Sequence, residues 1–167
     1  LRLCVISTGS MAPTINSGDL AVVNNLAYMI DEPQRGDVVV FEGEEKLLLK
    51  RIIAMPNDTI NFVDGRAVIN GKVLDEEYIT SGINTYSPNT FVVPEGHYFV
   101  LGDNRINSWD SRFFEQPYIE RSRIKAKLMF VIPVLKVPDV FSAEYYKKNR
   151  AQAILSSGII AFPILLK

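Results

Sequence analysis

The sequence predicts a mainly β protein, and three observations support that fold class. Apolar, β-branched runs are short and follow one another closely along the 167 residues. Turn-forming pairs such as Asp64-Gly65 and Asn70-Gly71 separate several of these runs. Only residues 139–155, with Asp139 as a candidate N-cap, have the pattern of a helix. Short strands with closely spaced turns favour a barrel or packed sheets.

The first half of the chain contains three predicted strands. Residues 20–24 are a short β-prone run, and residues 25–34 after them are irregular. Residues 38–41 form an apolar run typical of a buried strand. Residues 47–54 give the next strand, which ends at the turn-forming Pro56-Asn57-Asp58.

The second half begins with a predicted meander. Residues 59–63 and 66–69 form a hairpin around Asp64-Gly65, and Asn70-Gly71 marks a second tight turn. Residues 75–90 are rich in Ser, Asn and Thr and predict a long exposed loop or a β-ribbon.

Three further strands are predicted after that loop. Residues 91–93 and 97–101 flank the turn Pro94-Glu95-Gly96, and residues 124–132 form the last strand.

Composition and charge exclude several classes of protein. An apolar fraction of 47% supports a packed core and excludes a disordered chain. The net charge of −1 gives no bulk attraction to nucleic acid, so no nucleic-acid partner is expected. Cys4 and His97 are the single Cys and His, which excludes an internal disulfide and a metal site of paired cysteines. We expect no metal and no cofactor, and no obligate protein partner is evident.

Both ends of the chain bear on whether the protein associates with a membrane. The sequence starts at Leu1 without Met, which we interpret as a trimmed or processed chain whose upstream segment has been removed. Residues 154–166 are mostly apolar but shorter than the roughly 20 residues of a spanning helix. They fit a terminal helix docked on the core or an interfacial or truncated membrane segment.

The strongest candidate for chemistry is Ser10, in the run Ser7 to Thr14. This stretch combines small hydroxyl residues with Gly9 and ends at a turn, so Ser10 is expected on a tight, partly exposed segment. A serine nucleophile needs an accessible Oγ with backbone N–H groups nearby. Taken alone, the stretch is more typical of an ordinary loop between strands.

A nucleophilic serine needs a base, and the residues leave two candidates. His97 lies in a strand-like run whose alternation could direct it to either face. Lys50 follows three leucines, so strand alternation could place it on an apolar face and Arg51 on the opposite one. Burial lowers the pKa of a lysine, and a neutral amine is a competent general base. The commoner arrangement packs the stem on the sheet and leaves the ammonium in water.

A polar loop at residues 102–112 supplies possible supporting groups. Asp110 and Arg112 can form an ion pair that fixes the loop, and the Ser108 hydroxyl could orient the Lys50 amine. A turn in which Asp and Asn cap their own backbone would also account for this composition.

Four segments together resemble the bacterial type I signal peptidases, which are membrane-bound Ser-Lys endopeptidases. They are TGSMAPT at 8–14, RGDVVVF at 35–41, LKRIIAMPND at 49–58 and GDNRINSWDSR at 102–112. Their order and spacing match the family over roughly residues 7–133. The resemblance implies a β-barrel catalytic domain over residues 1–138, with a small β insertion at about 70–93. Residues 139–167 would then be a helical tail that could associate with a membrane.

The resemblance also assigns roles to individual residues. Ser10 matches the nucleophile and Lys50 the general base, while the Thr8 hydroxyl and the Ser10 N–H match the oxyanion donors. The supporting residues are Ser108, which positions the lysine, the ion pair Asp110 and Arg112, and Asp103 with Arg105, which hold the loop. Met11 is expected to pack beside Ser10, and His97 matches a position that relatives do not use in catalysis.

Two residues depart from the commonest family pattern. Asn57 stands where the motif usually has Gly, and Thr8 where Ser is frequent. Asn tolerates left-handed backbone better than most residues, and Thr keeps the hydroxyl. Neither departure therefore removes a group that the chemistry needs.

By this resemblance the protein removes signal peptides from secreted preproteins and cleaves after small residues of the Ala-X-Ala type. Its partners would be preprotein signal peptides and the membrane lipid surface, with the catalytic domain on the extracytoplasmic face of the cell membrane. Three alternatives stay open: a self-cleaving repressor, a peptidase specialised for few substrates, and a catalytically silent relative that binds secreted or pilus subunits.

Overall fold

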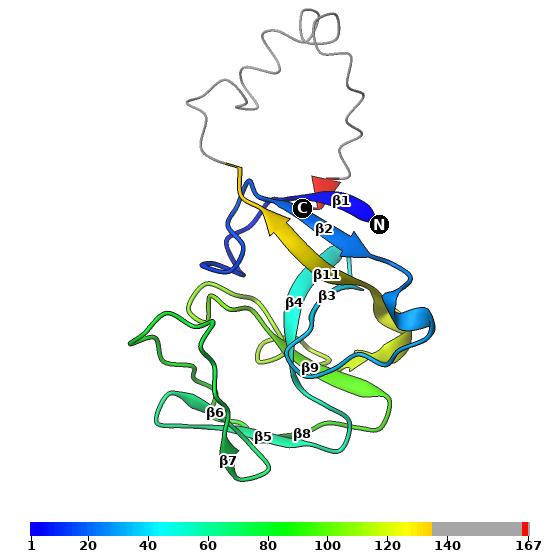
Figure 1. The fold of residues 1–167 in the computed structure, drawn as a ribbon. Coiled ribbons are helices and arrows are strands. Elements are labelled where there is room, and N and C mark those ends of the chain that lie inside the picture. The colour runs from blue at the N-terminus through cyan, green and yellow to red at the C-terminus, as the bar shows by residue number, and fades with distance from the viewer. Residues whose placement is uncertain (135–164, 167) are drawn as a thin grey trace, which may run out of the picture.

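Two β-sheets make up the part of the chain that the computed structural model describes, residues 1–134 and 165–166 (Figure 1). The larger sheet has eight strands in the order β10-β9-β4-β3-β11-β2-β1-β12, and the smaller has four in the order β7-β6-β5-β8. This arrangement confirms the mainly β fold class.

The strands alternate with turns and two short 3₁₀ helices. The larger sheet contains β1 (Arg2–Ile6), β2 (Leu20–Asn24), β3 (Val38–Glu42), β4 (Leu47–Ala54), β9 (His97–Leu101), β10 (Ile119–Glu120), β11 (Ile124–Ile132) and β12 (Leu165–Leu166). The smaller sheet contains β5 (Thr59–Val63), β6 (Arg66–Ile69), β7 (Lys72–Val73) and β8 (Phe91–Val92). The 3₁₀ helices are η1 (Ala27–Met29) and η2 (Arg121–Arg123).

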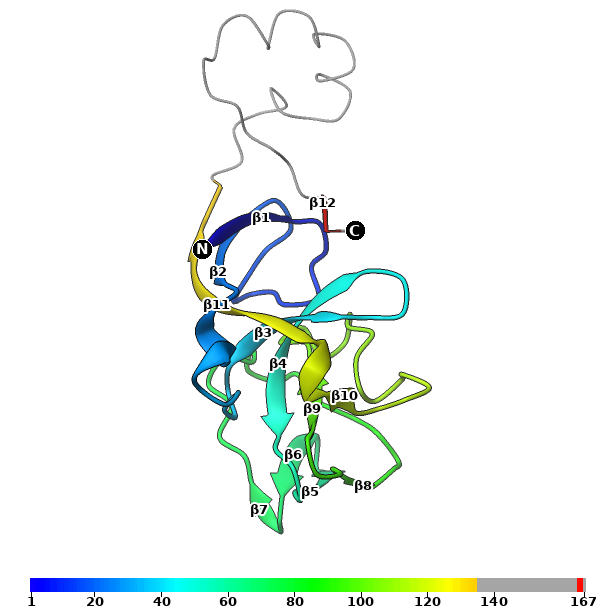
Figure 2. The same cartoon turned by 90° about the vertical axis from the view of Figure 1, so that its right-hand side faces the viewer.

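The strand pairs are antiparallel, except that β12 pairs with β1 in parallel. In the β3–β4 pair, Val39 lies opposite Lys50. A register shift between Ile52 and Ala54 bends β4 as it passes onto β9. Figure 2 shows β4 and β9 extending towards the smaller sheet, which lies at the far end of the molecule from β1 and β2.

One face of the β1-β2-β11 layer packs into the core. Alternation places Cys4, Ala21 and Val23 on this inner face, where they pack with Met11 and Ile15. Met11 and Ile15 are 1% and 0% exposed, so the segment that carries Ser10 is anchored by its own side chains.

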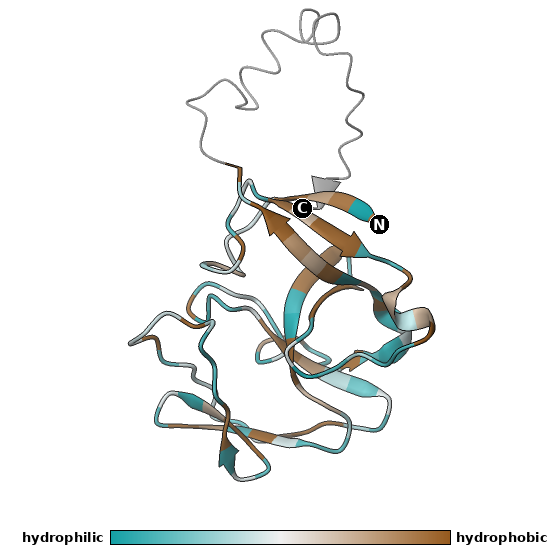
Figure 3. Ribbon diagram, viewed as in Figure 1, coloured by the Kyte–Doolittle hydropathy of each residue, from teal (hydrophilic) through white to brown (hydrophobic). Residues whose placement is uncertain are grey.

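The opposite face of the same three strands is also apolar, although it is open to solvent. Val22 lies opposite both Leu3 and Phe130, and Leu20 lies opposite both Val5 and Ile132. We call these six residues the outer apolar face. Leu3, Val5, Phe130 and Ile132 are 39–55% exposed, and Figure 3 shows hydrophobic colouring along all three strands.

A second apolar cluster joins the two sheets. Phe99 and Leu101 from β9 pack against Ile60 of β5 and Phe91 of β8. The Phe91 and Phe99 rings lie 4.7 Å apart between centroids. This contact fixes the smaller sheet against the end of the larger one, so both sheets share one core.

Most predicted strands are present, with three differences. Strands β1, β10 and β12 were not predicted, and residues 25–34 contain η1. Residues 75–90 are not simply an exposed loop, because Thr85 and Ser87 are buried at 1% and 8% exposure.

Several predictions about the C-terminal part cannot be compared with the structure. The predicted helix at 139–155 and the domain boundary at 138 lie outside the described residues.

The insertion at about 70–93 stays a prediction, and its ends, β7 and β8, lie in the smaller sheet with β5 and β6. Within residues 1–134 and 165–166, no helix is long and apolar enough to cross a membrane.

Candidate active site

Ser10 lies on a tight turn that follows β1. The Ala12 N–H donates to the Gly9 carbonyl at 3.2 Å, which closes the turn around the serine. Asn104 holds the same turn from outside: its backbone N–H donates to the Ser10 carbonyl at 3.1 Å and its Nδ2 to the Gly9 carbonyl at 3.0 Å. Ser10 is half-buried, and these hydrogen bonds fix the backbone on which its hydroxyl is carried.

The amine of Lys50 reaches the Ser10 hydroxyl. The Nζ–Oγ distance is 2.6 Å across 40 residues of sequence, and Lys50 is only 4% exposed. Burial lowers the pKa of Lys50 to about 8, although the nearby carboxylates of Asp110 and Asp103 oppose the shift. A neutral amine is therefore accessible near neutral pH, and it could accept the Ser10 proton.

Strand alternation explains why Lys50 is buried and its neighbour is not. Lys50 lies opposite the fully buried Val39, whereas Arg51 points to the other side of β4. There Arg51 donates to Asp103 from Nε at 2.9 Å and from Nη2 at 2.6 Å. The structure thus places Lys50 and Arg51 on opposite faces of β4, as strand alternation predicted.

Thr8 places a second hydroxyl next to the serine. Its Oγ1 lies 3.5 Å from Ser10 Oγ, and Thr8 is exposed. A donor beside the attacking oxygen, together with the Ser10 N–H, is the arrangement that an oxyanion requires. The role of Thr8 in stabilising an oxyanion remains a prediction.

Ser10 and Lys50 line a cavity of about 860 Å³. The cavity is bounded by β1, by the β3–β4 hairpin and by the end of the polar loop (residues 102–112). Its apolar lining includes Ile6, Met11, Phe41, Leu47, Leu48, Leu49, Trp109, Phe113, Phe114 and Ile119.

Asp110 and Arg112 form the predicted ion pair inside the polar loop. Arg112 donates to Asp110 from Nε at 2.8 Å and from Nη2 at 2.9 Å, and both side chains are almost fully buried. The Gly102 N–H donates to Asp110 at 3.1 Å. The pair therefore closes the loop at its two ends.

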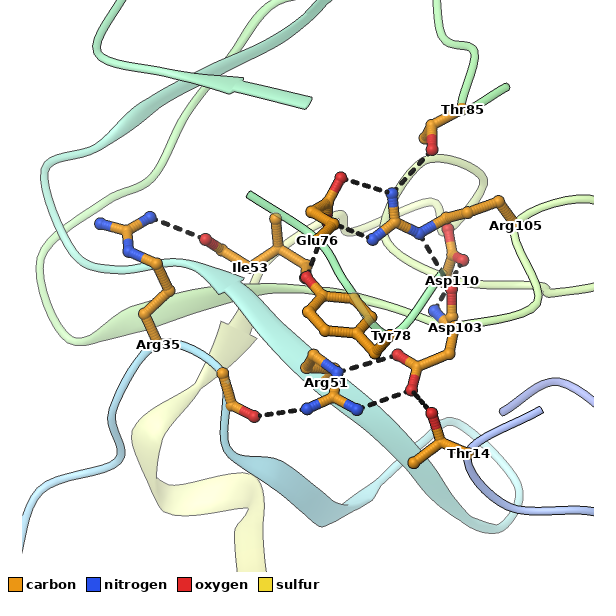
Figure 4. Close-up of polar contacts among 12 residues, drawn as sticks. Thr14, Arg35, Arg51, Ile53, Glu76, Tyr78, Thr85, Asp103, Arg105 and Asp110 are labelled. Carbon is orange, nitrogen blue, oxygen red and sulfur yellow. Dashed lines mark hydrogen bonds and ion pairs between the residues drawn. The ribbon is translucent and has the colours of Figure 1, made fainter. Parts of the chain in front are cut away.

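Asp103 and Arg105 hold the loop to its surroundings (Figure 4). Asp103 accepts from Arg51 and, at 2.6 Å, from the Thr14 hydroxyl. Arg105 donates from Nε to the Gly102 carbonyl at 3.1 Å and from Nη1 to Thr85 at 2.7 Å. Both residues are 1–2% exposed, which agrees with a supporting function.

Ser108 differs from its predicted arrangement. Its hydroxyl is buried and has no hydrogen-bond partner, so the predicted bond to Lys50 is not formed in this structure. The hydroxyl instead packs beside Gly102. A Cβ at residue 102 would lie 2.2 Å from Ser108 Oγ and 2.4 Å from the Ser10 carbonyl, so this packing requires glycine.

His97, the other candidate base, lies apart from the serine. It stands at the start of β9, its Nδ1 lies 2.8 Å from the Glu95 carbonyl, and it does not line the cavity. Lys50 is therefore the base that the geometry supports.

Sequence reasoning missed several residues that build the site. Asn104 and Thr14 lie inside recognised motifs, but which backbone or carboxylate they contact depends on the fold. Glu76 and Thr85 lie in a segment that the sequence indicated as exposed, and no local signal identifies them. Within the described residues, no three His, Cys, Asp or Glu side chains are grouped so as to hold a metal ion.

Curated proteins with similar sequences are signal peptidases or processing peptidases. The chain is 37% identical over 117 residues to "Probable signal peptidase I-2" of Synechocystis sp., covering 65% of this chain and 53% of that protein. It is 37% identical to "Signal peptidase I" of Bacillus caldolyticus, covering 75% and 76%. It is 31% identical to "Probable thylakoidal processing peptidase 2, chloroplastic" of Arabidopsis thaliana, covering 87% and 42%.

A solved structure is similar in fold and sequence. The crystal structure of a signal peptidase I from Enterococcus faecalis matches with a TM-score of 0.51 and 32% identity, covering 60% of this chain and 99% of that one. The chain spans 53% and 62% of the length of the cyanobacterial relatives from Synechocystis and Leptolyngbya laminosa. Residues 1–133 match the family described as "Signal peptidase, peptidase S26". The chain therefore belongs to the S26 family of signal peptidases.

Proposed function

We propose that this chain is the catalytic part of a serine endopeptidase that removes N-terminal signal peptides from secreted preproteins. The observation that carries the proposal is the 2.6 Å distance between Lys50 Nζ and Ser10 Oγ, with the amine buried. Membership of the signal peptidase family supports a signal peptide as the substrate class. The proposed location is the extracytoplasmic face of the cell membrane.

The geometry supports a two-step acyl transfer. Neutral Lys50 accepts the Ser10 proton while Oγ attacks the scissile carbonyl, and the Thr8 hydroxyl and Ser10 N–H stabilise the oxyanion. As the tetrahedral intermediate collapses, the C–N bond breaks and the Lys50 ammonium gives its proton to the leaving amine. Water then attacks the acyl-enzyme with Lys50 again as base, which releases the signal peptide and restores Ser10.

We further propose cleavage after small residues of the Ala-X-Ala type. The cavity that holds Ser10 is lined in part by the apolar side chains of Ile6, Met11, Leu47 and Leu49. An extended substrate that pairs with a strand edge would present alternate side chains to such walls.

The outer apolar face supports docking to a lipid surface. Leu3, Val5, Phe130 and Ile132 are exposed together, and Ser10 follows β1 by only a few residues. Burial of these side chains among lipid acyl chains would hold the site at the depth where a signal peptide leaves the membrane.

The test is cleavage of a purified preprotein in lipid vesicles, with the new N-terminus read by mass spectrometry. Wild type should release the mature protein after a small residue. Ser10→Ala and Lys50→Met should lose cleavage, whereas the exposed controls Ser17→Ala and Lys72→Met should keep it.

A protein that binds the preprotein without cleaving it would contradict the peptidase function and favour the catalytically silent alternative. Cleavage of only one or two preproteins from a broad set would favour the specialised peptidase.

A further inference from the structure

The segment at residues 74–90, which links β7 to β8, makes a polar contact with the catalytic side of the molecule (Figure 4). Sequence composition indicates an exposed loop here, yet the Glu76 side chain is only 8% exposed and Thr85 only 1%. Both side chains face Arg105 of the polar loop, which is itself fully buried.

Glu76 is the counter-charge of Arg105. Its Oε1 accepts from Arg105 Nη2 at 2.5 Å and its Oε2 accepts from Nη1 at 3.2 Å. Thr85 Oγ1 accepts from the same Nη1 at 2.7 Å. A buried guanidinium needs such partners, because an unpaired charge away from water is strongly unfavourable.

Glu76 also reaches the second arginine of the site through Tyr78. The Tyr78 hydroxyl donates to Glu76 Oε1 at 2.7 Å, and the Arg51 guanidinium lies 4.0 Å from the centre of the Tyr78 ring. Cations favour this position over an aromatic face. Burial and the neighbouring Glu76 carboxylate raise the pKa of Tyr78, which keeps its hydroxyl protonated as a donor.

The two arginines fix different parts of the chain around the Ser10–Lys50 pair. Arg51 follows Lys50 on β4 and binds Asp103 through two hydrogen bonds. Arg105 fixes the Gly102 carbonyl, and its own carbonyl accepts from Arg112 at 2.9 Å. Asn104, between Asp103 and Arg105, holds the backbone of Ser10. A shift of either arginine would therefore move the serine relative to the lysine.

We propose that Glu76 is a positioning residue for the Ser10–Lys50 pair, acting through Arg105 directly and through Tyr78 on Arg51. This inference rests on the proposed peptidase function. The inference assigns a function to the 74–90 segment. Its Glu76 carboxylate, which lies outside the four recognised motifs, fixes the polar loop so that Ser10 Oγ and Lys50 Nζ stay within hydrogen-bond distance.

The experiment compares Glu76→Gln with the matched control Glu77→Gln, which removes the same charge from an exposed neighbour. For Glu76→Gln, kcat for preprotein cleavage should fall roughly 10- to 100-fold with KM within about twofold of wild type, because a misplacement of about 1 Å carries a penalty of that order. Glu77→Gln should match wild type in both constants.

A second readout removes the preprotein from the measurement. The rate at which a small serine-acylating reagent labels Ser10 should fall by a similar factor in Glu76→Gln, because the reagent reports only on the serine and its base. Tyr78→Phe keeps the ring and loses one hydrogen bond, and Thr85→Val keeps the ion pair, so both should lower kcat by smaller factors than Glu76→Gln.

Thermal unfolding separates positioning from a purely structural contribution, and assays are run well below the midpoint of each variant. If folded Glu76→Gln labels and cleaves like Glu77→Gln, the positioning role is wrong, even if its midpoint is lower. If Glu76→Gln does not fold, unchanged kcat in both Tyr78→Phe and Thr85→Val overturns the inference. If the reagent labels wild type readily but wild type cleaves no preprotein, the proposed function is wrong. The labelling rates of the variants relative to wild type still test the role of Glu76.

Discussion

At the scale of single residues, the proposed chemistry depends on one buried amine. Lys50 is surrounded by strand residues that leave it 4% exposed, and burial is the first cause of its lowered pKa. The nearby carboxylates of Asp103 and Asp110 act in the opposite direction. The balance leaves a pKa of about 8, close enough to neutrality for a base that must be both uncharged and proton-accepting.

Thr8 gives a prediction at the same scale. Replacement by Val keeps the shape and deletes the hydroxyl, so we expect kcat to fall about 10²- to 10³-fold, as for other lost oxyanion donors. Thr8→Ser restores a hydroxyl and should keep most of the activity. Steady-state cleavage of a signal-peptide substrate measures both variants, and equal rates for Thr8→Val and wild type would remove Thr8 from the mechanism.

At the scale of elements, the polar loop is fixed by ion pairs with little exposure. Asp103 and its partner Arg51 have side chains that are 0% and 12% exposed. Removing one member of a buried pair leaves the other charge uncompensated. The loop is therefore an ordered part of the core, and its carboxylates serve both stability and the electrostatics of Lys50.

We expect Asp103→Asn to lower the free energy of unfolding by about 3–5 kcal/mol. The control is Glu32→Gln, which breaks the exposed Glu32–Arg121 pair and should change stability by less than about 1 kcal/mol. Urea unfolding of both variants provides the measurement. Equal, small effects would mean that the Asp103–Arg51 pair does not hold the loop.

Local sequence predicted strands better than it predicted contacts between them. Long apolar runs such as residues 38–41 and 47–54 become β3 and β4 because alternation and β-branching act locally. Strand β1 was missed because it lies at the start of the chain, and β10 and β12 were missed because each has only two residues. Asn57 adopts φ 70°, as its tolerance of left-handed backbone allows.

For the candidate site, the sequence identified the residues but not all of their partners. The Asp110–Arg112 pair spans two residues and was predictable from spacing. The pairing of Arg51 with Asp103 and of Arg105 with Glu76 joins segments 52 and 29 residues apart, so it depends on the fold. The family resemblance, rather than periodicity, singled out Ser10 and Lys50 together.

At the scale of the whole molecule, the larger sheet presents one apolar face to the core and another to solvent. The outer apolar face lies on β1, β2 and β11, whose inner face packs against the segment that carries Ser10 (Figure 3). Exposed apolar patches of this kind mark interaction surfaces, and this one supports the proposed docking to a lipid surface.

This surface gives a prediction about membrane binding. The double variant Leu3→Ser with Phe130→Ser should reduce binding to phospholipid vesicles by at least about tenfold, because burial of each apolar side chain contributes roughly 1.5–3 kcal/mol. Val92→Ser is the control, since Val92 is 61% exposed but lies in the smaller sheet. Vesicle flotation measures all three proteins, and undiminished binding of the double variant would exclude this face.

The pH dependence of kcat/KM tests the central claim most directly, since it reports the ionisation of the base in the free enzyme. Because only the neutral amine is active, kcat/KM for preprotein cleavage should rise roughly tenfold per pH unit at acidic pH and level off above the Lys50 pKa of about 8. The profile of His97→Gln should be the same. A rise centred near pH 6.5 that disappears in His97→Gln, or a rate that does not change between pH 6 and 9, would contradict a neutral Lys50 as the base for Ser10.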